Sequence, residues 1–172
     1  MNAELILTPT AVYQNGHYGA ALLTIAPIGT VLIAVGLVEL AVAAGAVAVA
    51  LAMVPDLDQR MPGITHRGPT HTIWFALVVG VITAAAAVAL AVAGPVVSAV
   101  TGFVVGTGTI GSHIAADALT PAGVRPWRPV DNTHYSLDVV KAKNPLANYA
   151  LLGLGVAGAA LAAWVGSTVA TF

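Results

Sequence analysis

The chain has 172 residues, of which 58% are hydrophobic and only 8% are charged, and its mean hydropathy is +0.90. An ordinary soluble domain has about 25% charged residues, so this composition argues against a water-soluble globule. The net charge of -1 provides no basic surface for nucleic-acid phosphates, so we expect no nucleic-acid partner. Because the chain has no cysteine, any metal must have nitrogen and oxygen ligands.

Five apolar stretches organise the chain, and a helix needs about 17–25 residues to cross the hydrocarbon core of a bilayer. Gly36 and Glu39 mark the break between the first two stretches. Pro95 and Pro145 open the last two, since proline suits a first helical turn. The sequence predicts one all-α integral-membrane domain over residues 1–172, a polytopic helix bundle with about five transmembrane helices. The predicted spans are 17–38, 39–54, 72–93, 96–116 and 145–165.

The basic residues indicate the orientation of the bundle. In a five-span chain all six basic residues lie in two loops, 56–71 and 117–144, on the same side as the N-terminus. These residues are Arg60, Arg67, Arg125, Arg128, Lys141 and Lys143. Lys and Arg accumulate in cytoplasmic loops, so this side is predicted to be cytoplasmic. We therefore expect a multi-pass protein of the inner (plasma) membrane with a cytoplasmic N-terminus. Its expected partners are membrane lipids, and assembly into a homo-oligomer is compatible with the sequence.

Four short motifs place ionisable residues at the predicted cytoplasmic ends of the spans, where such groups are costly and usually functional. They are Gly16-His17, Pro55-Asp56-Leu57-Asp58, His66-Arg67-Gly68-Pro69-Thr70-His71 and His113-Ile114-Ala115-Ala116-Asp117. The order of the spans brings the four motifs to one end of the bundle. Neutral imidazoles and carboxylates suit divalent Zn, Mn or Fe, so we predict one or two metal ions, with Zn or Mn favoured. The predicted ligands are His17, Asp56, Asp58, His66, His71, His113 and Asp117.

Each motif on its own also fits a structural role. His17 is typical of a residue at a lipid headgroup, and the Pro-Asp-Leu-Asp run is typical of a loop that ends a helix. His113 and Asp117, four residues apart on one helix face, fit an internal hydrogen bond. Their convergence on one end favours the metal site. His134 lies outside this set and is interpreted as a surface or substrate-contacting residue.

Three arginines add permanent positive charge beside the predicted site, and guanidinium groups match phosphate oxygens through paired donors. Arg67 is expected to contact a phosphate, with Arg125 behind it, whereas Arg128 fits a lipid anchor equally well. Thr70 is expected to cap the first turn of the third span, whose free N–H groups face an incoming anion. The predicted substrate-binding residues are thus Arg67, Thr70 and Arg125.

At these motifs the sequence strongly resembles the YdjM-like family, LexA-binding, inner-membrane-associated proteins described as membrane-bound metal-dependent hydrolases. The resemblance covers about Gly16 to Gly123 and rests on the Gly-His, Pro-Asp-Leu-Asp and His-Arg-Gly-Pro-Thr-His motifs and on the run from Ser112 to Gly123. It implies a multi-span membrane protein with a metal site at the residues proposed above. Many members have His after the second Asp, where this chain has Gln59, so one possible ligand is absent.

Together the motifs and the resemblance predict a metal-dependent hydrolase of a phosphoester in a phospholipid or other amphiphile. Asp58 or Asp117 is expected to accept the proton of the attacking water, and Arg67 to stabilise charge in the transition state. Two other classes stay open. A metal-ion transporter also has His and Asp in its spans, although transporter sites tend to lie near the bilayer midplane. A metal-stabilised binding or regulatory protein would need no catalysis.

Overall fold

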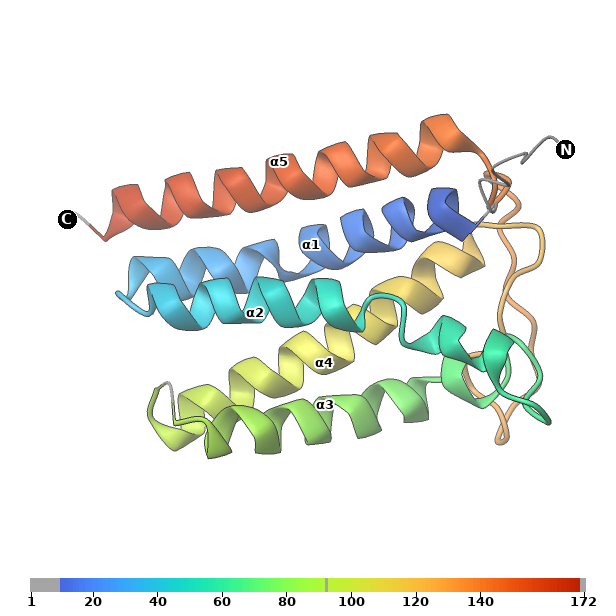
Figure 1. Ribbon diagram of the computed structural model, residues 1–172, viewed down its shortest axis with the longest axis horizontal. Helices are drawn as coiled ribbons and strands as arrows, with labels where there is room; N and C mark the ends of the chain where they lie inside the picture. Colours follow the sequence, from blue (N-terminus) through green and yellow to red (C-terminus); the bar gives the residue numbers. More distant parts are fainter. Residues whose placement is uncertain (1–9, 92, 171–172) are drawn as a thin grey trace, which may run out of the picture.

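The computed structural model describes residues 10–91 and 93–170, with side chains from Gln14 onward. Five α-helices run back and forth along one axis (Figure 1): α1 (Thr10–Ala34), α2 (Val38–Leu51), α3 (Ile73–Ala89), α4 (Pro95–Ala118) and α5 (Pro145–Val169). Two short 3-10 helices, η1 (Pro55–Arg60) and η2 (Pro69–His71), lie between α2 and α3. Within the described ranges there is no strand, only a bridge between Val124 and Tyr135. The predicted all-α fold is confirmed.

The helix boundaries follow local chemistry. Gly36, with φ of +81°, turns the chain between α1 and α2, and Pro95 and Pro145 open α4 and α5 as expected. The cap of α3 differs from the prediction, because its N-cap is Thr72, whose Oγ1 accepts a hydrogen bond from the backbone N–H of Phe75 at 3.2 Å. The prediction that Thr70 caps this helix is wrong, since η2 intervenes before α3 begins.

Three helices extend beyond a predicted boundary, and one of them is α5, which continues to Val169. α1 begins at Thr10, so His17 lies inside the helix rather than at its start. α4 continues to Ala118, which places both His113 and Asp117 on helical backbone. The predicted cytoplasmic N-terminus falls on residues 1–9, outside the described residues.

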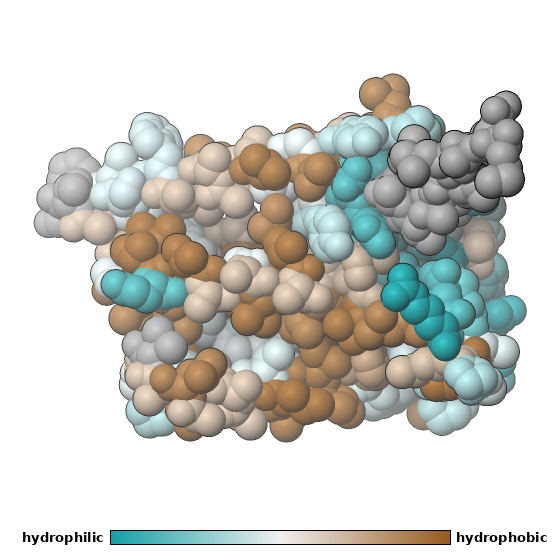
Figure 2. All heavy atoms as spheres, viewed as in Figure 1, coloured by the Kyte–Doolittle hydropathy of each residue, from teal (hydrophilic) through white to brown (hydrophobic). Residues whose placement is uncertain are grey.

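The lateral surface of the bundle suits a bilayer. Among the described residues, four segments are long and apolar enough to cross one: Gln14–Ala34, Val38–Arg60, Pro95–Ala118 and Pro145–Val169. α3 is apolar too but has only 17 residues. Figure 2 shows hydrophobic side chains over the middle of the helices and a hydrophilic group at the end where α2 connects to α3 and α4 to α5. Lipid tails fit the first surface, and water or headgroups fit the second.

Small residues hold the helices together in two close pairs, α1 with α5 and α3 with α4. A Cβ at Gly19 would overlap the backbone of Leu151, and one at Gly155 would overlap the backbone of Gly19. In the second pair, the hydroxyl of Thr83 donates to the carbonyl of Gly102 at 2.7 Å. Close backbone approach through glycine and hydrogen bonds through threonine are the usual means of helix association in lipid. α1 and α2 also pack against each other and against α4, so the ends of these three helices meet at the polar end.

Candidate metal centre

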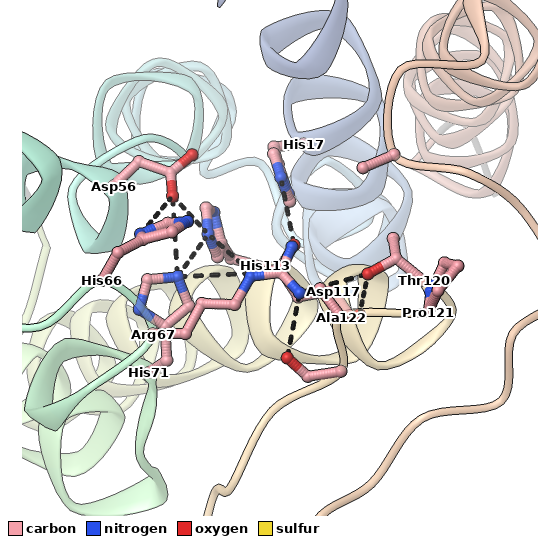
Figure 3. Close-up of polar contacts among 12 residues, drawn as sticks. His17, Asp56, His66, Arg67, His71, His113, Asp117, Thr120, Pro121 and Ala122 are labelled. Atoms are coloured by element: carbon pink, nitrogen blue, oxygen red, sulfur yellow. Dashed lines mark hydrogen bonds and ion pairs between the residues drawn. The ribbon is translucent and has the colours of Figure 1, made fainter.

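The polar end of the bundle gathers every predicted metal ligand, and Figure 3 labels all of them except Asp58. α1 provides His17, η1 provides both aspartates, the segment before α3 provides two histidines, and the end of α4 provides the last pair. The residues thus brought together are His17, Asp56, Asp58, His66, His71, His113 and Asp117. Four segments of the chain therefore build one cluster.

Two imidazole nitrogens lie at the middle of this cluster. The Nε2 atoms of His71 and His113 are 3.3 Å apart. Oδ1 of Asp56 lies 3.6 Å and 3.7 Å from them, and Oδ2 of Asp117 lies 3.3 Å and 3.7 Å from them. Three atoms with these separations share a point about 2.0 Å from each, which is the length of a Zn–N or Zn–O bond. The two imidazoles therefore form a triad with Asp56 and another with Asp117, and the spacing of each triad fits a divalent ion.

Hydrogen bonds fix the ring nitrogens that face this point. Nδ1 of His113 lies 2.7 Å from the carbonyl of Ala52 and donates to it, because a carbonyl only accepts. The hydroxyl of Thr70 donates to Oδ2 of Asp58 at 2.7 Å, which leaves its oxygen to accept from Nδ1 of His71 at 3.0 Å. Neutral forms of both rings then carry their lone pairs on Nε2, toward each other. Metal-binding histidines have this arrangement, with the distal nitrogen held by an outer acceptor.

One buried oxygen in the cluster has no hydrogen-bond donor. Asp117 is 4% exposed, and its Oδ2, which faces both imidazoles, has no hydrogen-bond partner. Burial alone would lower the pKa of His71, but the neighbouring carboxylates of Asp117 and Asp56 outweigh burial and raise that pKa to about 9. A proton on His71 thus offsets part of the carboxylate charge in the metal-free protein. A metal cation would take over that role.

Asp58 anchors the segment before α3. It is 1% exposed; its Oδ1 lies 2.9 Å from Nδ1 of His66, and its Oδ2 accepts from the backbone N–H of Arg67 at 3.1 Å. With the bond from Thr70, both carboxylate oxygens have partners. Asp58, His66 and His71 also place donor atoms within 4.8 Å of one another, so they form another group that is able to hold an ion.

Arg67 links the segment before α3 to the end of α4 and the turn that follows it. Its backbone is left-handed, with φ of 60°. Its Nη2 lies 2.7 Å from Oδ1 of Asp117, and its Nη1 donates to Oγ1 of Thr120 at 3.2 Å and to the carbonyl of Gly123 at 2.9 Å. A guanidinium has five N–H donors, so two stay available for a substrate. Asp117 is thereby oriented, with one oxygen on Arg67 and the other on the imidazoles.

His17 covers the cluster from α1. Its ring stacks on His113, with ring centroids 3.8 Å apart and the planes inclined by 13°. Its Nε2 is 3.9 Å from Oδ1 of Asp117, and its buried Nδ1 has no hydrogen-bond partner. His17, His113 and Asp117 form the third group with metal-ligand spacing.

A cavity of about 730 Å³ opens beside the cluster. Asp56, His66, Arg67 and Asp117 reach it from the site. His17 lines it as well, and the rest of the lining combines positive charge, amide groups and apolar surface, in Arg60, Lys143, Gln14, Gln59, Met53, Leu57, Ala122 and Ala142. An anion with an apolar portion fits this combination.

Some predicted contacts are not seen. Arg125 is exposed and lies outside the lining of the cavity, so the structure does not place it behind Arg67. His134, in contrast, is exposed as expected of a surface residue, and its Nε2 lies 2.9 Å from the carbonyl of Ala122. Arg128 pairs with Asn132 at 2.7 Å on the surface.

Other contacts were not foreseen from the sequence. Arg67 has two hydrogen-bond partners, Thr120 and Gly123, in the run from Ser112 to Gly123. The family motif marked this run as important but did not indicate that it binds Arg67. The carbonyl of Ala52 has no sequence signal, because any residue supplies one. Arg60 and Lys143 were recognised only as part of the charge pattern.

The fold and the cluster define a class: helical membrane proteins with a buried His/Asp centre at one end of the bundle. Residues 14–172 match the family described as YdjM inner membrane protein, and the chain belongs to that family. The match covers nearly the whole chain and extends beyond the motifs. No curated protein and no solved structure matches the chain.

Proposed function

We propose that this protein is a membrane-bound, metal-dependent hydrolase of phosphoesters carried by phospholipids or other amphiphiles. One observation carries the proposal: two imidazole lone pairs and two carboxylate oxygens converge at metal-ligand spacing beside a cavity with basic walls. His71, His113 and Asp56 would hold the ion, and Oδ2 of Asp117 would lie next to it. His17 and the pair Asp58–His66 offer donors for a second one.

A bound divalent ion such as Zn or Mn would act as a Lewis acid that lowers the pKa of water and polarises a phosphoryl oxygen. Asp117 is assigned as proton acceptor, because it lines the cavity and its Oδ2 has no donor. Asp58 is assigned as a positioning residue for His71, since both of its oxygens are hydrogen-bonded and it does not line the cavity.

The walls of the cavity support a phosphate-bearing substrate. Arg60, Arg67 and Lys143 surround it, and Arg67 keeps two N–H donors for phosphoryl oxygens. Met53 and Leu57 provide apolar contacts next to these charges. A phosphoester headgroup with its hydrocarbon portion in the bilayer matches both. The distribution of Lys and Arg supports a cytoplasmic orientation for this end.

The transporter alternative has less support. The donor atoms lie at one end of the bundle, and Glu39 is the only charged side chain of the described residues at the opposite end. Ion pathways are usually lined by polar groups near the midplane.

The proposal is tested with purified protein in vesicles, where hydrolysis of phosphomonoesters and phosphodiesters and uptake of the metal are measured side by side. Metal-dependent phosphate release is expected from the wild type, none from His71→Ala, and wild-type release from the matched control His134→Ala. Robust metal flux without hydrolysis would establish transport instead. Metal binding with neither activity would leave a non-catalytic protein and refute the enzyme.

A further inference from the structure

A short segment between α4 and α5, residues 137–143, lies against the end of α4. We call it the strap. The backbone N–H of Leu137 donates to the carbonyl of Ala118 at 2.8 Å, and that of Val139 donates to the carbonyl of Leu119 at 2.9 Å. These carbonyls belong to the last residues of a helix long enough to cross a bilayer. The strap is therefore fixed at the level where this span leaves the hydrocarbon core.

The strap exposes two apolar side chains with Asp138 between them, followed by two lysines, so its net charge is positive. Leu137 is 68% exposed and Val139 is 71% exposed, and both Lys141 and Lys143 are exposed. α5 begins two residues later, and its Leu146 is 78% exposed. Apolar side chains followed by lysines are typical of segments that lie in a membrane interface, with the lysines on anionic headgroups.

The strap also forms part of the wall between the site and its surroundings. Val140, Lys141 and Ala142 line a small cavity of about 60 Å³ together with His17 and Asp117. Ala142 and Lys143 line the larger cavity as well. A molecule bound to the strap therefore lies next to the His/Asp cluster.

We propose that the strap binds the membrane interface. Leu137 and Val139 insert among the acyl chains at the headgroup boundary, and Lys141 and Lys143 contact anionic headgroups. The chemical complement is a bilayer that contains anionic lipid: the strap leads into the apolar helix α5, whose first turn exposes Leu146, and the two lysines outnumber Asp138. This binding goes beyond the proposed function, because it requires no catalysis. Its consequence is that the mouth of the larger cavity opens at the headgroup layer.

The depth of the strap is tested with fluorescent labels, and the absence of cysteine from the chain makes single-cysteine variants specific. An environment-sensitive dye on Val139→Cys is compared with the same dye on Val130→Cys. Val130 is a matched control, since it is also a valine, is 79% exposed, and lies in a turn where its N–H bonds to Trp127 rather than to α4. In phosphatidylcholine–phosphatidylglycerol vesicles, nitroxide-labelled lipid is expected to quench the dye at 139, and aqueous iodide to quench the dye at 130.

Three results would overturn the proposal. The first is iodide quenching at 139 as strong as at 130. The second is equal quenching of both positions by labelled lipid, which would remove the assignment to the strap. The third is protection of position 139 from both quenchers, which would mean that a protein, such as a second copy of the chain, covers it. Loss of phosphoester hydrolysis is not a readout here, so failure of this proposal and of the proposed function are distinguishable.

The role of the lysines is tested by Lys141→Gln and Lys143→Gln, together and singly, in the variant labelled at 139. Each basic residue near an anionic surface contributes about 1 kcal/mol, which is about a fivefold change in the ratio of immersed to exposed strap. Lipid quenching is expected to fall with each substitution toward its value in pure phosphatidylcholine. Quenching at 139 that is independent of both the lysines and the anionic lipid would overturn the electrostatic part.

Discussion

Replacing Arg67 with Ala should strongly destabilise the metal-free protein. The guanidinium makes one ion pair of 2.7 Å with Asp117 and two further hydrogen bonds to Thr120 and Gly123. The Arg67 side chain is 15% exposed and the Asp117 side chain 5% exposed, so solvent screens the pair only weakly. Removing one partner of a buried pair costs about 3–5 kcal/mol, because the other charge stays buried without compensation. Ala keeps the Cβ at this left-handed position, so backbone strain is not altered.

The assay is equilibrium unfolding in detergent micelles, with and without a saturating divalent ion. Addition of the metal should recover part of the loss, since a cation compensates the charge of Asp117. Lys at position 67 should fall between Arg and Ala, because one ammonium replaces the charge but not the planar set of donors. A double-mutant cycle with Asp117→Asn isolates the pair. A coupling energy near zero, or a metal-free Arg67→Ala protein as stable as the wild type, would refute this account of Arg67.

Three more predictions follow from other contacts. Thr70→Val removes the hydroxyl between Asp58 and His71, so metal affinity should fall about 10–100-fold. The control Thr133→Val changes an exposed threonine bonded to Asp131 and should leave metal affinity unchanged. Equal affinities of the two variants, measured by isothermal titration in chelator buffers, would contradict this role of Thr70. The pKa of His71 is raised to about 9, so a metal must displace a proton from this ring at neutral pH, and metal affinity should rise about tenfold per pH unit below pH 9 and then level off. Because the pKa is raised, the stabilisation of the metal-free fold by this proton is complete below pH 6.5 and is lost as the pH rises through 9. A metal affinity that is independent of pH from 7 to 9 would argue against a protonated His71. Cysteines at Gly63 and Asn132 should react only from the cytoplasmic side and one at Ser167 only from the other; labelling of Gly63 and Ser167 from one side would exclude the five-span orientation.

The convergence of the four motifs was predictable because it depends on the order of the spans alone. Once Gly36, Pro95 and Pro145 divide the chain into antiparallel helices, residues near alternate ends must meet. The i, i+4 spacing of His113 and Asp117 likewise specifies a shared face, and the structure places His113 Nε2 and Asp117 Oδ2 3.7 Å apart. These features follow from helix geometry, which is local and regular.

The partners of Arg67 were not predictable in the same way. Sequence reasoning directs an exposed loop arginine toward a substrate phosphate, but here a left-handed residue 67 turns the guanidinium toward Asp117. Similarly, the two aspartates of η1 look equivalent in sequence. The 3-10 turn separates them: Asp56 faces the imidazoles of His71 and His113, and Asp58 holds His66 and Thr70. Such distinctions depend on irregular backbone, for which residue spacing gives no rule.

The metal content of the purified protein shows whether the His/Asp cluster is a metal centre. The wild type and His134→Ala should each contain at least one equivalent of a divalent transition metal after dialysis. His71→Ala should contain none, because it lacks the Nε2 that both candidate triads share with His113. A wild type without stoichiometric metal after exposure to Zn or Mn, or His71→Ala with a full complement, would contradict the account.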